Sequence, residues 1–220
     1  MIRTVKSDRS AEEILSLIGS TFGGATENDI SIFYYSGHGD EGGALVGRDG
    51  DLLYPAELRS TLYSVKGRKV IIVDACYSGG ILQSGAKRGG SPACDFNYSL
   101  LSAFSDGTRK RNGSETNGQG AYSQYFIMAS ARVDQTCQEN VITSGNTSKI
   151  MGYFTYYLCK GCGWDGVTSR NTVKAADANG DGVVSFGEAF SYAGTMAGKS
   201  NPYQDAQSNM GGCLSFSPFR

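Results

Sequence analysis

Histidine is almost missing from this chain of 220 residues: His38 is the only one, which excludes zinc sites built on two histidines. Proline is also scarce, at 4 residues, which excludes extended polyproline segments. Neither sign of charge is in excess, because 20 Lys and Arg stand against 21 Asp and Glu. The net charge of −1 gives no electrostatic reason to bind nucleic acid or an anionic membrane surface. No apolar run approaches the ~20 residues of a membrane-spanning helix.

The composition of the chain predicts a soluble globular protein. Hydrophobic residues make up 40% of the chain, enough to bury the core of one domain. The 31 glycines are about twice the usual share, so we expect tight turns and functional loops. Residues 1–20 lack the basic start and apolar stretch of a secretory signal. The chain is therefore expected in the cytoplasm, or outside the cell with its export signal not part of this sequence.

The six cysteines are too few for a fold held together by disulfides. Cys159 and Cys162 have the spacing of a zinc or redox pair, but no second pair accompanies them and no thioredoxin-like pattern surrounds them. A local disulfide, or two buried thiols, is the favoured interpretation.

Local patterns predict an α/β fold. A capping box, Ser10 to Glu13, precedes apolar residues at helical spacing and predicts a helix over residues 11–20. Apolar runs at 30–35 and 70–73 have strand length, and Pro55 opens a helix between them. A strand, helix, strand order with a right-handed crossover predicts two parallel strands in one sheet.

The second half of the chain is less regular. Residues 83–124 are rich in Gly, Ser and Asn, and a stretch this long is expected to be a mobile, cleavable loop. A third strand is predicted near residues 125–129. Residues 149–158 carry Ile150, Met151, Phe154 and Leu158 at helical spacing and predict a core helix.

His38 and Cys76 each follow one of the two predicted parallel strands. His38 lies in Tyr35-Ser-Gly-His-Gly39 and Cys76 in Asp74-Ala-Cys-Tyr-Ser-Gly79. Loops that leave the carboxyl ends of neighbouring parallel strands meet at one edge of the sheet, so the two side chains are predicted to lie together. A thiolate beside an imidazole can attack a carbonyl, and the N–H groups of Gly39 and Cys76 could hold the resulting oxyanion.

These two motifs resemble those of caspase-like cysteine peptidases, most closely the metacaspase and bacterial caspase-homologue branch. The resemblance runs from about Thr21 to Ala131 and continues weakly to Thr136. It implies a three-layer fold with a mostly parallel central sheet flanked by helices, in a single domain over residues 1–220. The Gln-Ala-Cys-Arg-Gly type of true caspases is absent, so their aspartate specificity is not expected here. Only about 29 residues precede the histidine strand, fewer than is usual in the family, as in a fragment, a processed form or a shortened variant.

The resemblance places Asp74 in the pocket for the residue ahead of the scissile bond, with Ser36 and Asp134 as neighbouring pocket positions. A carboxylate there recruits Arg or Lys, so cleavage after Arg or Lys is expected. The alternative is that Asp74 merely caps a turn at the end of its strand. A legumain-like enzyme that cleaves after Asn is the nearest rival activity, and an acidic pocket argues against it.

A twelve-residue segment, 177–188, has the spacing of an EF-hand calcium loop, with glycine at its sixth position. Its oxygen ligands would be Asp177, Asn179, Asp181, the Val183 carbonyl and Glu188. A turn without metal would not explain why Gly182 and Glu188 fall in register. Ca²⁺ is the one cofactor expected, and a calcium-responsive binding module without turnover is the rival from another functional class.

Arg109-Lys110-Arg111 is a basic cluster inside the expected loop. An enzyme selective for basic residues would cut its own chain there, and caspase-like enzymes are often processed between these same elements. Cleavage is predicted after Lys110 or Arg111, with Lys87-Arg88 as the second choice.

Overall fold

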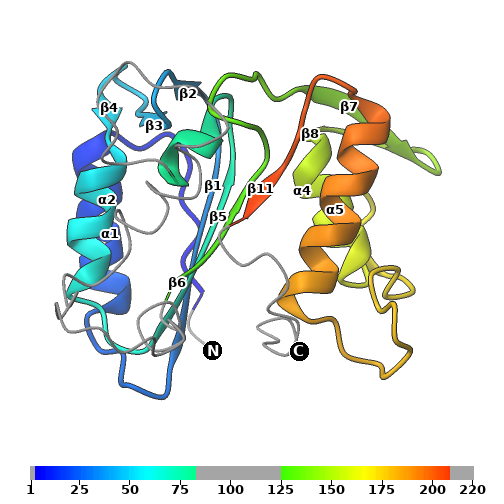
Figure 1. The fold of residues 1–220 in the computed structure, drawn as a ribbon, viewed down its shortest axis with the longest axis horizontal. Coiled ribbons are helices and arrows are strands. Elements are labelled where there is room, and N and C mark those ends of the chain that lie inside the picture. The colour runs from blue at the N-terminus through cyan, green and yellow to red at the C-terminus, as the bar shows by residue number, and fades with distance from the viewer. Residues whose placement is uncertain (1–2, 83–124, 209–220) are drawn as a thin grey trace, which may run out of the picture.

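The computed structural model describes residues 3–82 and 125–208, which form three layers, with a central sheet between two layers of helices (Figure 1). The sheet has the order β1-β5-β6-β11. Its strands are β1 (Ile30–Ser36), β5 (Arg68–Asp74), β6 (Tyr125–Ala129) and β11 (Gln207–Ser208). The first three run parallel and β11 is antiparallel to β6. This confirms the predicted α/β class with a mostly parallel sheet.

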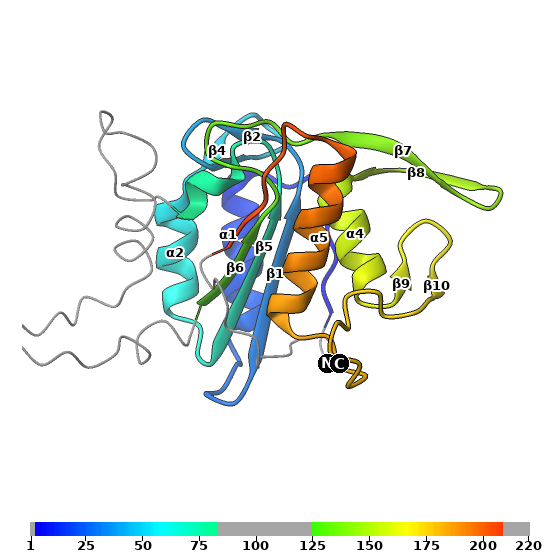
Figure 2. The ribbon, with the colours of Figure 1, turned by 45° about the vertical axis from the view of Figure 1, so that its right-hand side comes forward.

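Two helices cover each face of the sheet (Figures 1 and 2). One face carries α1 (Ala11–Phe22) and α2 (Pro55–Tyr63), and the other carries α4 (Tyr153–Gly161) and α5 (Phe186–Ser200). The capping box predicted at the start of α1 is present, because Ser10 Oγ accepts from the Glu13 N–H at 3.1 Å and Glu13 accepts from the Ser10 N–H at 2.9 Å. Pro55 begins α2, as predicted.

Alternation along β5 divides the core in two, and only its first residue is exposed. Ile71 and Val73 face α1 and α2, where they join Ile18, Leu58, Leu62 and Ile127. Val70 and Ile72 face α4 and α5, where they join Phe126, Met128, Phe154 and Phe186. A strand buried on both faces reads as a continuous apolar run, which is why β5 is recognisable in the sequence.

Several short strands lie outside the main sheet. The small meander β2 (Gly39–Asp40), β3 (Ala44–Val46) and β4 (Leu52–Leu53) follows β1, and the 3₁₀ turn η1 (Ser78–Leu82) follows β5. The hairpin of β7 (Glu139–Ser144) and β8 (Thr147–Gly152) projects from the body (Figure 2). A last pair, β9 (Trp164–Asp165) and β10 (Arg170–Asn171), follows α4.

The helix predicted over residues 149–158 is wrong in its first part. Residues up to Gly152 belong to β8, and α4 begins only at Tyr153. The helical spacing of Ile150 and Met151 is accidental, because Ile150 pairs across the hairpin with Val141 and both side chains are exposed. Gly152, in extended conformation, separates the strand from the helix.

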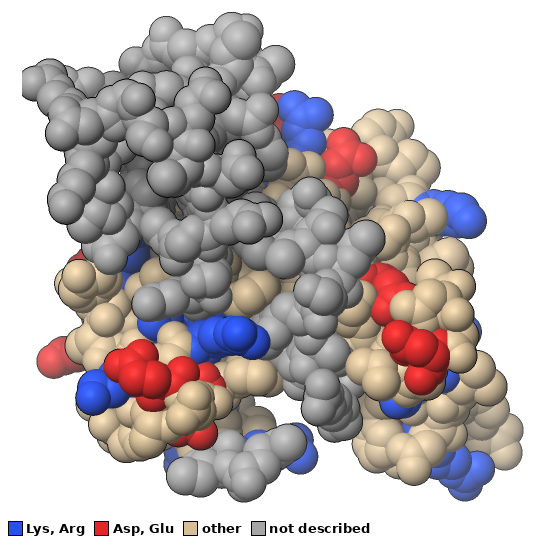
Figure 3. All heavy atoms as spheres, turned by 60° about the horizontal axis from the view of Figure 1, so that its bottom comes forward, with Lys and Arg blue, Asp and Glu red and all other residues tan. Residues whose placement is uncertain are grey.

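Lys110 and Arg111, the predicted cleavage positions, lie outside the described residues, as do Lys87, Arg88 and the whole expected loop. None of the helices within residues 3–82 and 125–208 is long and apolar enough to cross a membrane. On the face turned downward in Figure 1, acidic and basic side chains of the described residues are interspersed (Figure 3), so neither sign of charge dominates there.

Candidate active site

The His38 loop and the Cys76 turn leave adjacent parallel strands at the same level. Ser36 pairs with Asp74 at the end of the β1–β5 ladder, and the Gly37 N–H donates to the Asp74 carbonyl at 3.2 Å. Two residues further on, the Gly39 backbone packs directly against the carbonyl group of Cys76. A Cβ at position 39 would overlap that carbonyl oxygen, so only glycine permits this approach. The segments that carry His38 and Cys76 therefore touch.

The His38 backbone is held from the side of β3. Its carbonyl accepts from the Val46 N–H at 3.0 Å and from the Tyr35 hydroxyl at 2.8 Å. The His38 side chain is exposed, and its ring makes no hydrogen bond within the described part of the chain. An anchored backbone with an unengaged ring suits a residue that must exchange protons with a bound molecule.

The turn that carries Cys76 is strained. Tyr77 has a φ of 56°, the left-handed region that a bulky residue rarely adopts. The Tyr77 N–H is fixed by the Gln135 carbonyl at 2.7 Å, and the Ala75 N–H is fixed by Ser130 Oγ at 3.2 Å. The loop after β6 thus holds the turn from both sides, and it presents the half-buried Cys76 at the carboxyl end of β5.

A second thiol, Cys137, lies against the first. The two sulfur atoms are 3.8 Å apart, and Cys76 Sγ is 3.6 Å from the Cys137 carbonyl oxygen. Burial raises the pKa of the Cys137 thiol far above its usual range, and the charges of Asp74 and Cys76 raise this pKa further. Cys137 is therefore held as a neutral thiol and is a poor nucleophile at neutral pH.

Asp74 is 3% exposed and caps a helix as well as ending β5. Its Oδ2 atom accepts from the Thr155 N–H at 2.9 Å and from the Thr155 hydroxyl at 2.6 Å, in the first turn of α4. Its Oδ1 atom is buried and has no hydrogen-bond partner among the described residues. Asp74 thus caps the start of α4, and not a turn at the end of β5, through only one of its two carboxylate oxygens.

The other two residues predicted to line the pocket are placed differently. Ser36 is exposed at the end of β1, beside Asp74 in the register of the sheet. Asp134 is exposed and forms a two-point ion pair with Arg132, with nitrogen–oxygen distances of 3.1 and 3.2 Å. Arg132 thus offsets the charge of Asp134, whereas the Asp74 carboxylate meets only neutral donors.

Two backbone N–H groups near Cys76 are candidates for holding an oxyanion. The Cys76 N–H makes no hydrogen bond within the described residues. Because the Val46 N–H donates to the His38 carbonyl, Gly39 and Leu45 form a pair without mutual hydrogen bonds, and the Gly39 N–H points away from β3.

Comparison with known proteins identifies the family of this chain. A family model of the caspase domain, Peptidase_C14, matches residues 2–175. The chain belongs to the caspase-domain family. This assigns it to a family of cysteine peptidases, which are thiol-dependent hydrolases. The crystal structure of protein GSU0716 from Geobacter sulfurreducens is similar, at 16% identity over 91% of this chain and 72% of that one, with a TM-score of 0.46. No curated protein matches the sequence.

The predicted calcium loop follows the caspase-domain match and leads into α5. Asp177 accepts from the N–H groups of Gly180, Asp181 and Gly182, at 2.9, 3.2 and 2.8 Å. Glu188 reaches back to the Ala178 N–H at 3.2 Å and so joins the two ends of the loop. Residues 162–176, between α4 and the loop, contain the short strands β9 and β10 and no helix.

The donor set of this loop suits a hard cation that prefers oxygen. Carboxylate and amide oxygens of Asp177, Asn179 and Asp181 all turn into the loop, where they accept from its N–H groups. Hydrogen bonds from Ser185 lower the pKa of Glu188 and keep it ionised. The described residues hold no group of three His, Cys, Asp or Glu side chains already gathered at metal-binding distance. Calcium binding would therefore require these side chains to exchange their backbone N–H partners for the ion.

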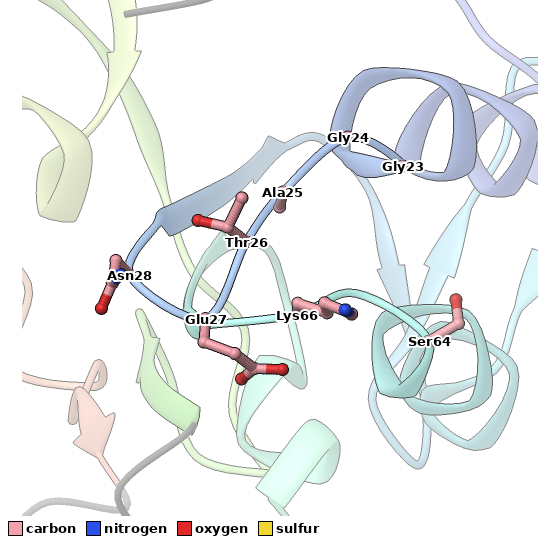
Figure 4. Close-up of a pocket in the computed structure, with 8 residues that line it drawn as sticks. All are labelled: Gly23, Gly24, Ala25, Thr26, Glu27, Asn28, Ser64 and Lys66. Carbon is pink, nitrogen blue, oxygen red and sulfur yellow. The ribbon is translucent and has the colours of Figure 1, made fainter.

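Cys159 and Cys162 are both free and half-buried, at the end of α4 away from Asp74. Burial raises the pKa of both thiols, that of Cys162 to about 12. This agrees with the interpretation as buried thiols. A separate hollow of about 420 Å³ lies at the other end of the sheet, between the α1–β1 loop and Lys66 (Figure 4), and none of the candidate residues lines it.

Two residues of the site were not assigned a role from the sequence. Cys137 follows the third parallel strand, so the rule that joined His38 to Cys76 could have found it. Thr155 left no signal, because the sequence placed it inside a longer helix and not in the first turn, where its N–H is free to bind Asp74.

Proposed function

We propose that this chain is a cysteine endopeptidase that cleaves after Arg or Lys, with Cys76 as nucleophile and His38 as proton carrier. The Cys76 sulfur bonds to the substrate carbonyl carbon, and the carbon–nitrogen bond breaks as His38 protonates the leaving amine. A water molecule, deprotonated by His38, then hydrolyses the thioester and restores the thiol. The N–H groups of Gly39 and Cys76 hold the oxyanion in both steps.

The observation that carries this proposal is the contact between Gly39 and the Cys76 carbonyl. It brings the segment that carries the chain's only histidine against the strained, anchored turn that carries Cys76. Cys137 is the other thiol at this edge, and burial raises its pKa, whereas Cys76 lies on the anchored turn directly after β5.

Specificity for a basic residue is proposed to come from Asp74 Oδ1. A buried carboxylate oxygen without a partner is costly, and a guanidinium or ammonium group would supply the missing hydrogen bond and the opposite charge. A substrate must displace the groups that cover this oxygen. Asp134 is proposed to contribute less to this specificity, because Arg132 already forms an ion pair with it. Ser36 is proposed to line the pocket beside Asp74, its neighbour in the β1–β5 register.

Calcium is proposed to bind the 177–188 loop through Asp177, Asn179, Asp181, the Val183 carbonyl and Glu188. Gly180 and Gly182, with φ of 75° and 79°, provide the positive-φ turns that a calcium loop of this length needs. The ion would order the start of α5, one of the two helices that pack beneath the sheet on the Asp74 side.

The deciding experiment is labelling of the full chain, with calcium, by a thiol-reactive peptide ending in arginine. A Cys76 adduct is expected, and matched peptides ending in asparagine or aspartate should label far more slowly. Faster labelling by the asparagine peptide would favour the legumain-like activity. Absence of a Cys76 adduct with all three peptides would favour the non-catalytic calcium-responsive module.

A further inference from the structure

Cys76 and Cys137 come from the turns that follow β5 and β6, two neighbouring strands. Their sulfur atoms are 3.8 Å apart, whereas a disulfide bond measures about 2 Å. The hydrogen bond from the Tyr77 N–H to the Gln135 carbonyl, at 2.7 Å, ties the two segments together beside the sulfurs. Small side-chain rotations would therefore join the sulfurs without moving the sheet.

We propose that Cys76 and Cys137 form a reversible oxidation site, in which a peroxide oxidises Cys76 and Cys137 then closes a disulfide with it. The first step rests on the reactivity that the proposed function gives to Cys76. The second step rests on the sulfur–sulfur contact alone. The site would switch the peptidase off, because the sulfur that attacks the substrate is held in the disulfide.

The chemistry balances with hydrogen peroxide as oxidant. The Cys76 thiolate sulfur attacks one peroxide oxygen, the O–O bond breaks, and the products are a sulfenic acid and, after protonation, one water. The Cys137 sulfur then attacks the Cys76 sulfur, and the S–O bond breaks. The hydroxyl group leaves with the Cys137 proton as a second water. Two thiols are thereby oxidised and one peroxide is reduced to two waters.

The surroundings of Cys137 suit this second role. Burial and the charge of Cys76 raise the pKa of Cys137, so it remains a thiol and does not compete for the peroxide while Cys76 is reduced. Oxidation of Cys76 to the sulfenic acid removes that neighbouring charge and so removes one cause of the raised pKa. Cys159 and Cys162 lie at the far end of α4 from the Asp74 contact, so neither is placed to resolve an oxidised Cys76. Capture by Cys137 would also spare Cys76 from irreversible oxidation to the sulfinic acid.

The sequence makes the linkage easy to map, because trypsin leaves each cysteine on a separate peptide. Cys76 lies in residues 70–87 and Cys137 in residues 133–149. The reduced full chain is treated with hydrogen peroxide, alkylated, digested and examined by mass spectrometry. The expected product is a reducible link between these two peptides, with loss of two alkylatable thiols. A link from the Cys76 peptide to any other peptide, or no link, would overturn the proposal.

Cys137→Ser and Cys137→Ala separate resolution from simple oxidation. In the wild type, peroxide should reduce activity at least tenfold and dithiothreitol should restore it. In both variants the loss should become irreversible, with sulfinic acid on Cys76. The matched control is Cys162→Ser, which removes a buried thiol elsewhere and should recover like the wild type. Equal recovery in the Cys137 variants would refute the role of Cys137.

These readouts also separate this inference from the proposed function. If the arginine peptide fails to label reduced Cys76 but the 70–87 and 133–149 peptides still become linked, the peptidase assignment fails and the oxidation site stands. If labelling succeeds and no link forms under peroxide, the peptidase assignment stands and the oxidation site fails.

Discussion

The backbone of Gly39 rests on the carbonyl oxygen of Cys76 so closely that no side chain fits between them. Ala75 Cβ borders the same space, so an added methyl group could not turn aside. This contact sets the spacing between the histidine loop and the cysteine turn, and it makes residue 39 a test of the candidate site.

Gly39→Ala should push the His38 loop away from Cys76. We expect kcat/KM to fall on the order of a hundredfold, because a displacement of about 1 Å at reacting groups has that effect. Gly19→Ala in α1 is the control, since a Cβ there meets nothing within 4 Å and helix propensity favours alanine. Steady-state kinetics and melting temperature should be measured for both, and unchanged kinetics in Gly39→Ala would contradict the assigned spacing.

Cys76→Ala should abolish peptidase activity and leave the melting temperature nearly unchanged, because Cys76 is half-buried at the site and not part of either core. Cys159→Ala is the comparison, since it removes another half-buried thiol distant from His38. Residual activity above trace level in Cys76→Ala would mean that another nucleophile does the chemistry.

Thr155 is expected to act as a positioning residue for Asp74. Thr155→Val removes the hydroxyl donor to Oδ2 and should raise KM for arginine substrates on the order of tenfold with little change in kcat. Thr155→Ser keeps both donors and should restore KM.

Asp74→Asn keeps an acceptor for α4 but removes the charge, so this variant should lose the preference for Arg and Lys while Cys76 still reacts with a small alkylating reagent. A preference that survives Asp74→Asn would rule out the pocket assignment.

Calcium should raise the free energy of unfolding by about 2–3 kcal/mol at a hundredfold excess over its dissociation constant. Glu188→Gln should weaken this response most among single changes. In calcium-free protein, Glu188 has a lowered pKa, so its stabilising contribution is present above the ordinary value of 4.5 and is lost as pH falls through the lowered value. The difference in melting temperature between wild type and Glu188→Gln should therefore shrink on acidification. A melting temperature that changes with neither calcium nor a chelator would contradict the proposed calcium site.

Self-processing should cut after Lys110 or Arg111, with Lys87-Arg88 second, and the two fragments should stay together. Their association follows from the β5–β6 ladder, in which Lys69 to Val73 pair with Tyr125 to Ala129 across the cut. Intact mass and size-exclusion chromatography should be compared for wild type and Cys76→Ala in calcium. Equal cutting in the mutant, or an uncut wild type, would refute self-processing.

Elements with strong local signals were predictable. The capping box at Ser10, Pro55 at a helix start and the apolar run of β5 each act within a few residues, so the pattern survives in the sequence. The β7–β8 hairpin was missed, although its two-residue turn begins with Gly145 at a φ of 59°, a recognisable hairpin signal. Missing that turn also misplaced the start of α4.

The candidate site was predictable only where it follows strand ends. The loops that carry His38 and Cys76 leave β1 and β5, which the strand–helix–strand order predicted to be parallel neighbours. The bond between Asp74 and Thr155 spans 81 positions, and it depends on where α4 begins. Such a bond is a product of tertiary packing, which no local pattern encodes.

The match to the caspase family stops at residue 175, yet α5 lies beyond it and is not an appendage. Ala189, Ala193 and Ala197 are fully buried along one side of α5, and Phe186 meets Phe126 edge to face at 5.6 Å. A chain shortened to the family boundary would lose α5, so that only α4 would remain on the face of β5 and β6 that carries Phe126 and Met128. We expect such a fragment to expose apolar surface and aggregate, so a stable shortened form of this protein should extend through Ser200.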